Sequence, residues 1–172
     1  STKTGGFHQH YGKENIIRNN IFAFAKLYQA QCTRVEKHRS FNFEKNIILF
    51  NEGVVLQGAW EKIDVQMDNN IYWNTTGDEY IFNGQSFNEW QKSGHDSNSL
   101  IANPHFTNPT EFDFRFKKKN NIKKIGFVPF DYSEAGVYGE TEWLEKASLP
   151  ESILTAFDKA VEENMNQNTK RD

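Results

Sequence analysis

The sequence has little cysteine, little proline and no long apolar run. Its 172 residues include one cysteine and four prolines. Because Cys32 is alone, no intrachain disulfide can form, and the chain has neither a CxxC pair nor a zinc-type cluster of Cys and His. No apolar run approaches the roughly twenty residues that a membrane-spanning helix needs. We therefore predict no membrane span and no metal site.

The sequence also lacks a large excess of positive or negative charge. The chain carries 20 Lys and Arg against 23 Asp and Glu, a formal net charge of -3, whereas nucleic-acid-binding domains are usually basic. A nucleic-acid partner is therefore not expected. Aromatic residues, by contrast, are plentiful: they make up 15 % of the chain and include 15 Phe. This apolar content is sufficient for the core of one globular domain, or of part of a larger one.

The most informative feature is an internal repeat. Similar segments occur at residues 15–22, 41–48 and 65–72, and each contains an Asn at the same place. This Asn recurs in steps of 26 and 24 residues, as Asn20, Asn46 and Asn70. An apolar residue stands three positions before each Asn and an Ile directly after it (Ile17, Phe43, Met67; Ile21, Ile47, Ile71). The pattern predicts two short strands that meet at a tight turn in every repeat.

A third strand per repeat is expected between these pairs, at residues 30–34, 54–58 and 79–83. Three strands in about 25 residues is the period of a parallel β-helix, so an all-β fold of this kind is predicted. The repeated Asn side chains would stack as a ladder, and Asn tolerates the left-handed backbone angles of such turns. Leucine-rich repeats share the period but require leucines that are absent here. An antiparallel sandwich of two sheets is the alternative, because its short strands look the same locally.

The repeat is interrupted after Asn83. Ser86 and Glu89 have the spacing of a capping box and predict a short inserted helix. Residues 113–116 then alternate like one more strand. The aromatic stretch 126–139 is suited to covering the solenoid surface or its open end.

A helical apolar stripe after Ser148 predicts a C-terminal helix. We therefore expect two parts in the chain. Residues 1–145 would form β-helix coils with their closing segment, and residues 146–172 would form the C-terminal helix and a tail.

The segments after the repeat resemble a known family. They are Ser86-Phe87-x-Glu89-Trp90-Gln91, Gly94-His95-Asp96-Ser97-x-Ser99 and Ala102-Asn103-Pro104-x-Phe106, followed by Asp113-Phe114-Arg115-Phe116 and a Gly-Phe-x-Pro-Phe-Asp closure from Gly126. Together with the repeat they resemble the C-terminal region of secreted bacterial right-handed parallel β-helix proteins of the pectate-lyase-like superfamily, over nearly all of residues 5 to 145. Asn103 departs from the usual acid, and Asn120-Asn121-Ile122 departs from the usual Ser-Pro-Ala turn.

The resemblance implies a class of function. The superfamily is rich in glycoside hydrolases and polysaccharide lyases, so it implies a secreted, periplasmic or cell-surface bacterial protein that binds a polysaccharide or oligosaccharide on the outside of its β-helix. The leading hypothesis is a fragment of a glycoside hydrolase. A polysaccharide lyase acting on uronates is the second hypothesis, and a non-catalytic glycan-binding or cell-surface scaffold is the third. Because Gly5, Gly6 and the aromatic stretch after them look like the inside of a domain, upstream coils of the same protein are expected as a partner.

Equivalent positions of successive coils predict a substrate groove. Ten positions before the repeated Asn stand His10, Glu36 and Trp60, and twelve positions before it stand His8, Arg34 and Gly58. Such residues would be neighbours, because adjacent strands lie about 4.8 Å apart. An aromatic ring can stack on a sugar, an Arg can hold a carboxylate or hydroxyl, and a Glu and a His can transfer protons. The predicted catalytic residues are Glu36 and His10, and the predicted substrate-binding residues are His8, Arg34, His38 and Trp60.

Hydrolysis needs a second carboxyl group. Glu61, Asp64 or an acid in the upstream coils is expected to supply it. No cofactor is expected for a hydrolase, whereas a lyase would use Ca²⁺ or Arg34 to neutralise a uronate. His95 and Asp96 resemble a catalytic pair, but within a Gly-x-Asp-x-x-Ser loop we interpret Asp96 as fixing the loop by hydrogen bonding.

Overall fold

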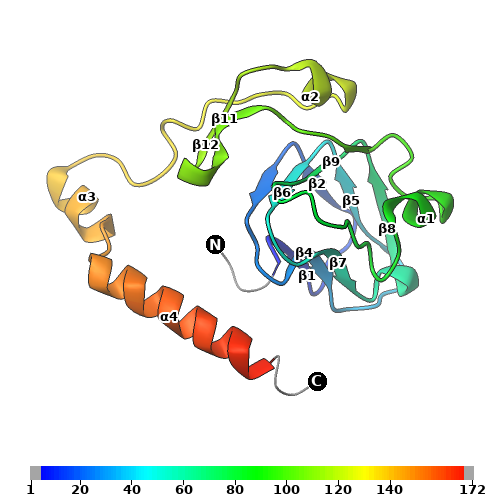
Figure 1. The fold of residues 1–172 in the computed structure, drawn as a ribbon, viewed down its shortest axis with the longest axis horizontal. Helices are drawn as coiled ribbons and strands as arrows, with labels where there is room; N and C mark the ends of the chain where they lie inside the picture. The colour runs from blue at the N-terminus through cyan, green and yellow to red at the C-terminus, as the bar shows by residue number, and fades with distance from the viewer. Residues whose placement is uncertain (1–4, 169–172) are drawn as a thin grey trace. The chain divides into compact units, whose positions relative to one another are not determined.

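The computed structural model describes residues 5–168 and shows a parallel β-solenoid of about four turns. Three parallel sheets surround a common interior in Figure 1. The predicted β-helix is confirmed and the antiparallel sandwich is excluded, because every pairing in these three sheets is parallel. The chain divides into two compact units, one ending at Val128 and the other beginning at Pro129.

Each of the first three turns of the solenoid contributes one strand to each sheet. The strands of the first sheet are β1 (Phe7–Gln9), β4 (Tyr28–Cys32) and β7 (Val54–Gly58). Those of the second are β2 (Asn15–Arg18), β5 (Arg39–Glu44) and β8 (Asp64–Asp68). Those of the third are β3 (Ile21–Ala23), β6 (Ile47–Phe50), β9 (Ile71–Asn74) and β10 (Leu100–Ile101).

The register of the sheets reproduces the sequence repeat. Ile21 pairs with Ile47, which pairs with Ile71. Ile17 likewise pairs with Phe43, which pairs with Met67. The sequence spacing alone was therefore sufficient to place the second and third sheets.

The predicted Asn ladder is present at the turn between the second and third sheets. The side-chain Oδ1 of Asn46 accepts from the backbone N of Asn20 at 3.0 Å, and Oδ1 of Asn70 accepts from the backbone N of Asn46 at 3.0 Å. The left-handed residue of each turn is the one before the ladder Asn, not the ladder Asn itself (Asn19, Lys45, Asn69; φ 60°, 54° and 56°). The ladder side chains serve to satisfy backbone donors of the preceding coil.

The interior is filled mainly by aromatic rings. Phe7 packs edge-on against Phe41 with ring centres 5.0 Å apart, and Phe41 packs edge-on against Trp60 at 5.9 Å. Trp60 in turn contacts Trp90 at 6.5 Å. Phe and Trp rings thus form a continuous aromatic stack along the interior of the solenoid.

The fourth turn departs from the pattern. The strand expected at residues 79–83 is reduced to a single parallel bridge between Leu56 and Phe82. Where the next strand of the second sheet would follow, the chain forms the predicted helix α1 (Phe87–Lys92). Its capping box is complete: Ser86 Oγ accepts from Glu89 N at 3.4 Å, and the Glu89 carboxylate accepts from Ser86 N at 2.9 Å.

The segment after the fourth turn covers the outside of the third sheet. It contains β11 (Phe106–Asn108), the 3-10 helix η2 (Pro109–Glu111), β12 (Asp113–Phe116) and α2 (Asn120–Lys124). Its buried side chains, among them Phe106 and Ile122, pack on Ile47, Leu49 and Ile71 in a second core. Residues 113–116 are the strand expected there, although β12 pairs antiparallel with β11 and is not part of a coil.

The second unit contains α3 (Thr141–Ala147) and α4 (Glu151–Asn168). The helix α4 confirms the predicted C-terminal helix, whereas α3 was not predicted. The proposed division after residue 145 stays a prediction. Within the part of the chain that the structure describes, no helix is both long enough and apolar enough to cross a membrane.

Candidate functional site

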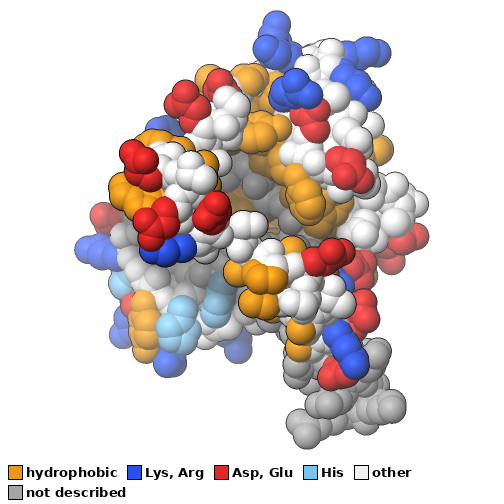
Figure 2. All heavy atoms as spheres, turned by 90° about the vertical axis from the view of Figure 1, so that its left-hand side faces the viewer, with side chains coloured by type: hydrophobic (Ala, Val, Ile, Leu, Met, Phe, Trp, Pro, Cys, Tyr) orange, Lys and Arg blue, Asp and Glu red, His pale blue; other side chains and the backbone are white. Residues whose placement is uncertain are grey.

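Five of the predicted site residues lie in or next to the loops that connect the first sheet to the second. His8 lies in β1 and His10 follows it, while Arg34, Glu36 and His38 lie between β4 and β5. Thr33 joins the two groups. We call these six residues the histidine corner. Histidine side chains gather at the surface in the view of Figure 2.

The structure corrects the alignment of these residues between coils. His8 pairs with Gln31, which pairs with Gln57, whereas Gly58 pairs with Cys32. The aligned positions on the two sides of the loop lie six, nine and seven residues apart in successive coils (9 to 15, 32 to 41, 58 to 65). The sequence positions were counted backwards from the ladder Asn, and that count passes through this loop of variable length. His10 and Glu36 therefore lie at the same corner of the solenoid but not at equivalent positions of their coils.

Thr33 fixes the orientation of both histidine rings. Its hydroxyl donates to the backbone O of Gln9 at 3.0 Å, which uses its single hydrogen. His8 Nε2 lies 2.8 Å and His10 Nδ1 lies 3.1 Å from the same oxygen, and with the hydroxyl hydrogen on Gln9 O both rings donate to it. In this arrangement neutral His10 has its hydrogen on Nδ1 and its lone pair on Nε2.

Tyr11 and Arg34 form an exposed aromatic and cationic pair next to the histidines. The guanidinium carbon of Arg34 lies 4.9 Å from the centre of the Tyr11 ring. The ring of Tyr11 also packs edge-on against His10 at 4.8 Å, and 61 % of the residue is exposed. Tyr11 thus offers an aromatic surface beside a positive charge, a combination suited to a sugar ring or a carboxylate.

Glu36 and His38 approach each other on the inner side of the same loop. Nε2 of His38 lies 3.4 Å from Oε2 of Glu36 and 3.2 Å from the backbone O of Gly12. Since a carbonyl only accepts, this nitrogen carries a hydrogen. Among the described residues, Oε2 of Glu36 is buried and has no hydrogen-bond partner. Oε2 of Glu36 therefore faces the N–H of His38 and is shielded from solvent.

Trp60 does not lie at the surface. It is only 1 % exposed, and its indole Nε1 donates to the backbone O of Gln57 at 3.0 Å. The ring of Trp60 belongs to the interior aromatic stack, so the structure does not present it to a sugar, and its predicted substrate contact stays a prediction. Tyr11 supplies the exposed ring instead.

The two candidates for a second carboxyl group differ in their surroundings. Asp64 accepts from Arg39 Nε at 2.5 Å, in an ion pair across neighbouring coils. Within residues 5–168, the side-chain hydrogen bond that Glu61 accepts is a long one, 3.4 Å from the Gln85 amide. Glu61 lies in the 3-10 helix η1 (Trp60–Lys62), in the turn that follows the coil of Glu36. Glu61 is thus the carboxylate with the weaker competing interaction.

A second polar cluster caps the Asn ladder within the fourth turn. Asp96 is fully buried, and its Oδ2 accepts from the Tyr72 hydroxyl and the Trp90 indole, each at 2.9 Å. Its Oδ1 accepts from the Asn70 amide at 3.0 Å and from the Ser99 hydroxyl. Burial raises the pKa of Asp96, while these four hydrogen bonds oppose the rise. Asp96 thus fixes the loop by hydrogen bonding, as the sequence indicates.

His95 has a packing role beside this cluster. Its ring stacks on Trp90 with centres 4.2 Å apart. Burial lowers the pKa of His95, and the nearby Asp96 partly offsets that effect. The neutral ring is therefore the favoured form, and a flat ring on an indole explains its position better than proton transfer does.

The histidine corner adjoins a hollow of about 360 Å³ at the first turn. Its rim includes His8 and Tyr11, and its floor includes the interior residues Phe7, Ile17 and Phe41. Within residues 5–168, no three His, Cys, Asp or Glu side chains are arranged to hold a metal ion. The sequence analysis did not predict Thr33 and Tyr11 as site residues. Their places in the sequence, directly before Arg34 and directly after His10, could have indicated them.

Comparison of the chain with known protein families, with curated proteins and with solved structures found no match.

Proposed function

We propose that the chain is part of a secreted, periplasmic or cell-surface bacterial enzyme of the right-handed, pectate-lyase-like β-helix superfamily. In this proposal it hydrolyses a polysaccharide or oligosaccharide that binds at the histidine corner. The proposal combines the resemblance of residues 5 to 145 with the geometry of the corner.

One observation carries the proposal: two successive coils bring histidines, an exposed aromatic ring and a carboxylate into the same pair of loops. Tyr11 and Arg34 would hold the sugar, and His10 Nε2 would exchange a proton with it. Glu36 is the carboxylate of the corner. Its catalytic partner would be Glu61, in the corresponding loop of the next coil. Retaining hydrolysis needs the two carboxyl groups about 5 to 5.5 Å apart.

The upstream coils belong to the same proposal. The floor of the hollow at the first turn is apolar (Phe7, Ile17, Phe41) and continues the interior aromatic stack. A preceding coil would extend this stack and place further side chains beside His8 and Tyr11. An acid on that coil would be the alternative to Glu61 as the second carboxyl group.

The test measures new reducing ends released from a panel of neutral and acidic polysaccharides. Glu36→Gln and His10→Ala are each expected to lower turnover at least about 100-fold, because each removes a proton-transfer group. The matched control is Glu79→Gln, which changes an exposed acid outside the corner and should retain wild-type turnover. Wild-type turnover in both corner variants would contradict the proposal, and binding without cleavage in the wild type would favour a scaffold.

A polysaccharide lyase is the second candidate, and Arg34 favours it. Its guanidinium stacks on Tyr11, which leaves the N–H groups at its edge able to hold a uronate carboxylate. The described residues do not fit a Ca²⁺ site, so Arg34 would have to neutralise the charge. Ultraviolet absorbance of unsaturated uronate products, without hydrolytic products, would establish the lyase.

A further inference from the structure

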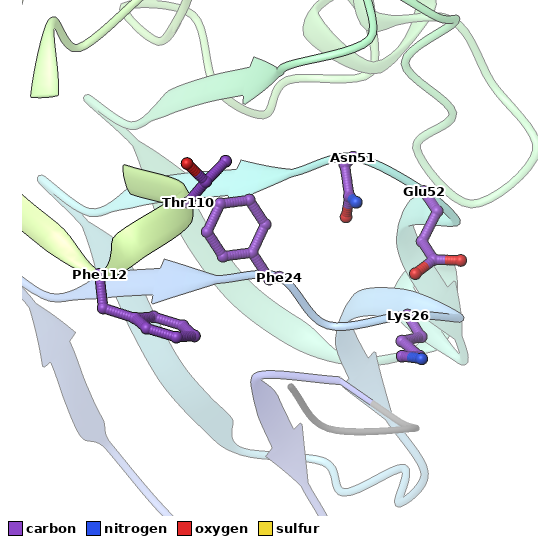
Figure 3. A pocket seen from close by; sticks show the side chains of 6 residues that line it. All are labelled: Phe24, Lys26, Asn51, Glu52, Thr110 and Phe112. Atoms are coloured by element: carbon purple, nitrogen blue, oxygen red, sulfur yellow. The ribbon is translucent and has the colours of Figure 1, made fainter. Parts of the chain in front are cut away.

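A second hollow lies at another corner of the solenoid, where the covering segment meets the turns between the third and first sheets. Its volume is about 330 Å³. It is lined by six residues from three chain segments, and Figure 3 shows them: Phe24, Lys26, Asn51, Glu52, Thr110 and Phe112. Ligand pockets range from about 300 to 1,000 Å³, so this hollow is large enough for a single sugar ring.

Two phenylalanine rings form one side of the hollow. Phe24 and Phe112 lie 6.4 Å apart with their planes at 81°. Both residues have left-handed backbone angles, with φ of 59° and 58°, which is uncommon for a bulky side chain. Backbone hydrogen bonds hold them there: Phe24 N donates to Leu49 O at 2.8 Å, and Phe112 N donates to Pro109 O at 3.1 Å. Strained residues of this kind often occur at binding sites.

The opposite side of the hollow is polar. Figure 3 shows Asn51, Glu52 and Lys26 together on the side away from the two rings. They provide an amide, a carboxylate and an ammonium group, so the two charges cancel. Thr110 adds a hydroxyl oxygen that can accept, because its hydrogen is donated to Asn108 Oδ1 at 3.0 Å.

The two turns that carry these polar groups are held firmly together. The buried Gln29 amide donates to Ala25 O at 2.9 Å and to Glu52 O at 3.1 Å. Gly53 has φ of +77°, and a Cβ there would collide with the backbone oxygens of Lys26 and Leu27. The turns therefore approach as closely as glycine permits. A site held in this way loses little conformational entropy when a ligand binds.

We propose that this hollow is a carbohydrate-binding site for one neutral hexopyranose unit of a glycan. The apolar C–H face of the sugar would pack on Phe24 and Phe112, and its hydroxyls would bond to Asn51, Glu52 and Lys26. The balanced charge favours a neutral sugar over a uronate. This site is separate from the histidine corner, and it stands whether or not the corner is catalytic.

The experiment follows backbone amide signals of the whole chain by NMR during titration with cellobiose, maltose, lactose and digalacturonate. At least one neutral disaccharide is expected to shift the signals of residues 24–26 and 51–53, with an affinity at least about tenfold above that of digalacturonate. Phe112→Ala should weaken the binding about tenfold by removing a stacking ring. This residue is 62 % exposed, so the substitution leaves the core intact. The matched control Val35→Ala changes another exposed apolar residue and should bind as the wild type does.

Two further variants distinguish binding in this hollow from binding at the histidine corner and from non-specific binding. Glu52→Gln leaves Lys26 unopposed, so it should raise the affinity for digalacturonate relative to the neutral sugars. His10→Ala should leave the binding unchanged. The proposal is overturned if no probe shifts these signals, if Phe112→Ala binds as tightly as the wild type, if Glu52→Gln keeps the wild-type selectivity, or if His10→Ala abolishes binding.

Discussion

At the scale of the residue, Asp96 shows how one buried charge can be tolerated. The carboxylate loses its water completely on folding, and its four donors come from Asn70, Tyr72, Trp90 and Ser99. Burial raises the pKa of Tyr72, so its hydroxyl keeps the proton that it donates. Because Asn70 is a ladder residue and Trp90 lies in α1, the carboxylate ties the inserted helix to the end of the ladder.

Asp96→Asn is expected to lower the free energy of unfolding by about 2 kcal/mol at pH 7, because an amide nitrogen would face donors that need an acceptor. Denaturant titration measures this, with the exposed Asp78→Asn as the control, expected to change stability by less than about 0.5 kcal/mol. Equal stability of the two variants would contradict the role given to the network.

The same residue predicts a pH dependence. Burial raises the pKa of Asp96 above its ordinary 3.8, so the folded protein keeps the proton after the unfolded chain has released it. The contribution of this proton to stability is therefore full below pH 3.8 and declines as the pH rises towards the folded pKa. The stability difference between the wild type and Asp96→Asn should be larger at low pH than at pH 7. A difference that grows with pH would show that the hydrogen bonds outweigh the burial.

At the scale of the element, the Asn ladder determines how one coil sits on the next. Each rung accepts from the backbone N of the previous coil, and the last rung is a serine: Ser99 Oγ accepts from Asn70 N at 2.7 Å. The amide of Asn46 also donates to Ile17 O at 2.9 Å. The Asn46 rung therefore satisfies one backbone donor and one backbone acceptor in a partly buried turn.

Asn46→Ala is expected to lower the free energy of unfolding by about 3 kcal/mol, since it leaves the Asn20 amide and the Ile17 carbonyl without partners. The exposed Asn88→Ala on α1 is the matched control. Hydrogen exchange adds a local measure, because the amide of Asn20 should exchange faster in the variant. Unchanged exchange at Asn20 would show that the ladder bond does not protect it.

At the scale of the whole molecule, the solenoid has two cores. One fills its interior, and the other lies between the third sheet and the covering segment. The residues of both cores lie before Val128. The covering segment makes the outer face of the third sheet part of the core, whereas the loops of the histidine corner and the hollow at Phe24 stay open.

A chain that ends at Val128 is expected to keep the β-sheet circular dichroism and the cooperative unfolding transition of the first unit, because both cores are retained. Its helical signal should fall through the loss of α3 and α4. Thermal unfolding of the two chains provides the measurement. Loss of the cooperative transition in the shorter chain would show that the second unit is needed for folding.

The sequence by itself determined the coil period, the ladder and the inserted helix. These depend on local rules, since a turn residue, a capping box or an alternating strand needs only its neighbours in the chain. The repeat presents the same local pattern in three successive coils. Aligning Asn20, Asn46 and Asn70 therefore gave the register of the second and third sheets.

Only the tertiary structure decided which residues form the histidine corner and that Trp60 is buried. The loop before the second sheet changes length from coil to coil, so equal spacing in sequence does not mean equal position in space. Burial also depends on packing. The ring of Trp60 lies in the interior, where it contacts Phe41 and Trp90 of neighbouring coils. The hollow at Phe24 depends on Phe112, a residue 88 positions away in the chain. No local pattern connects the two, because contact at that range arises only when the covering segment folds back over the third sheet.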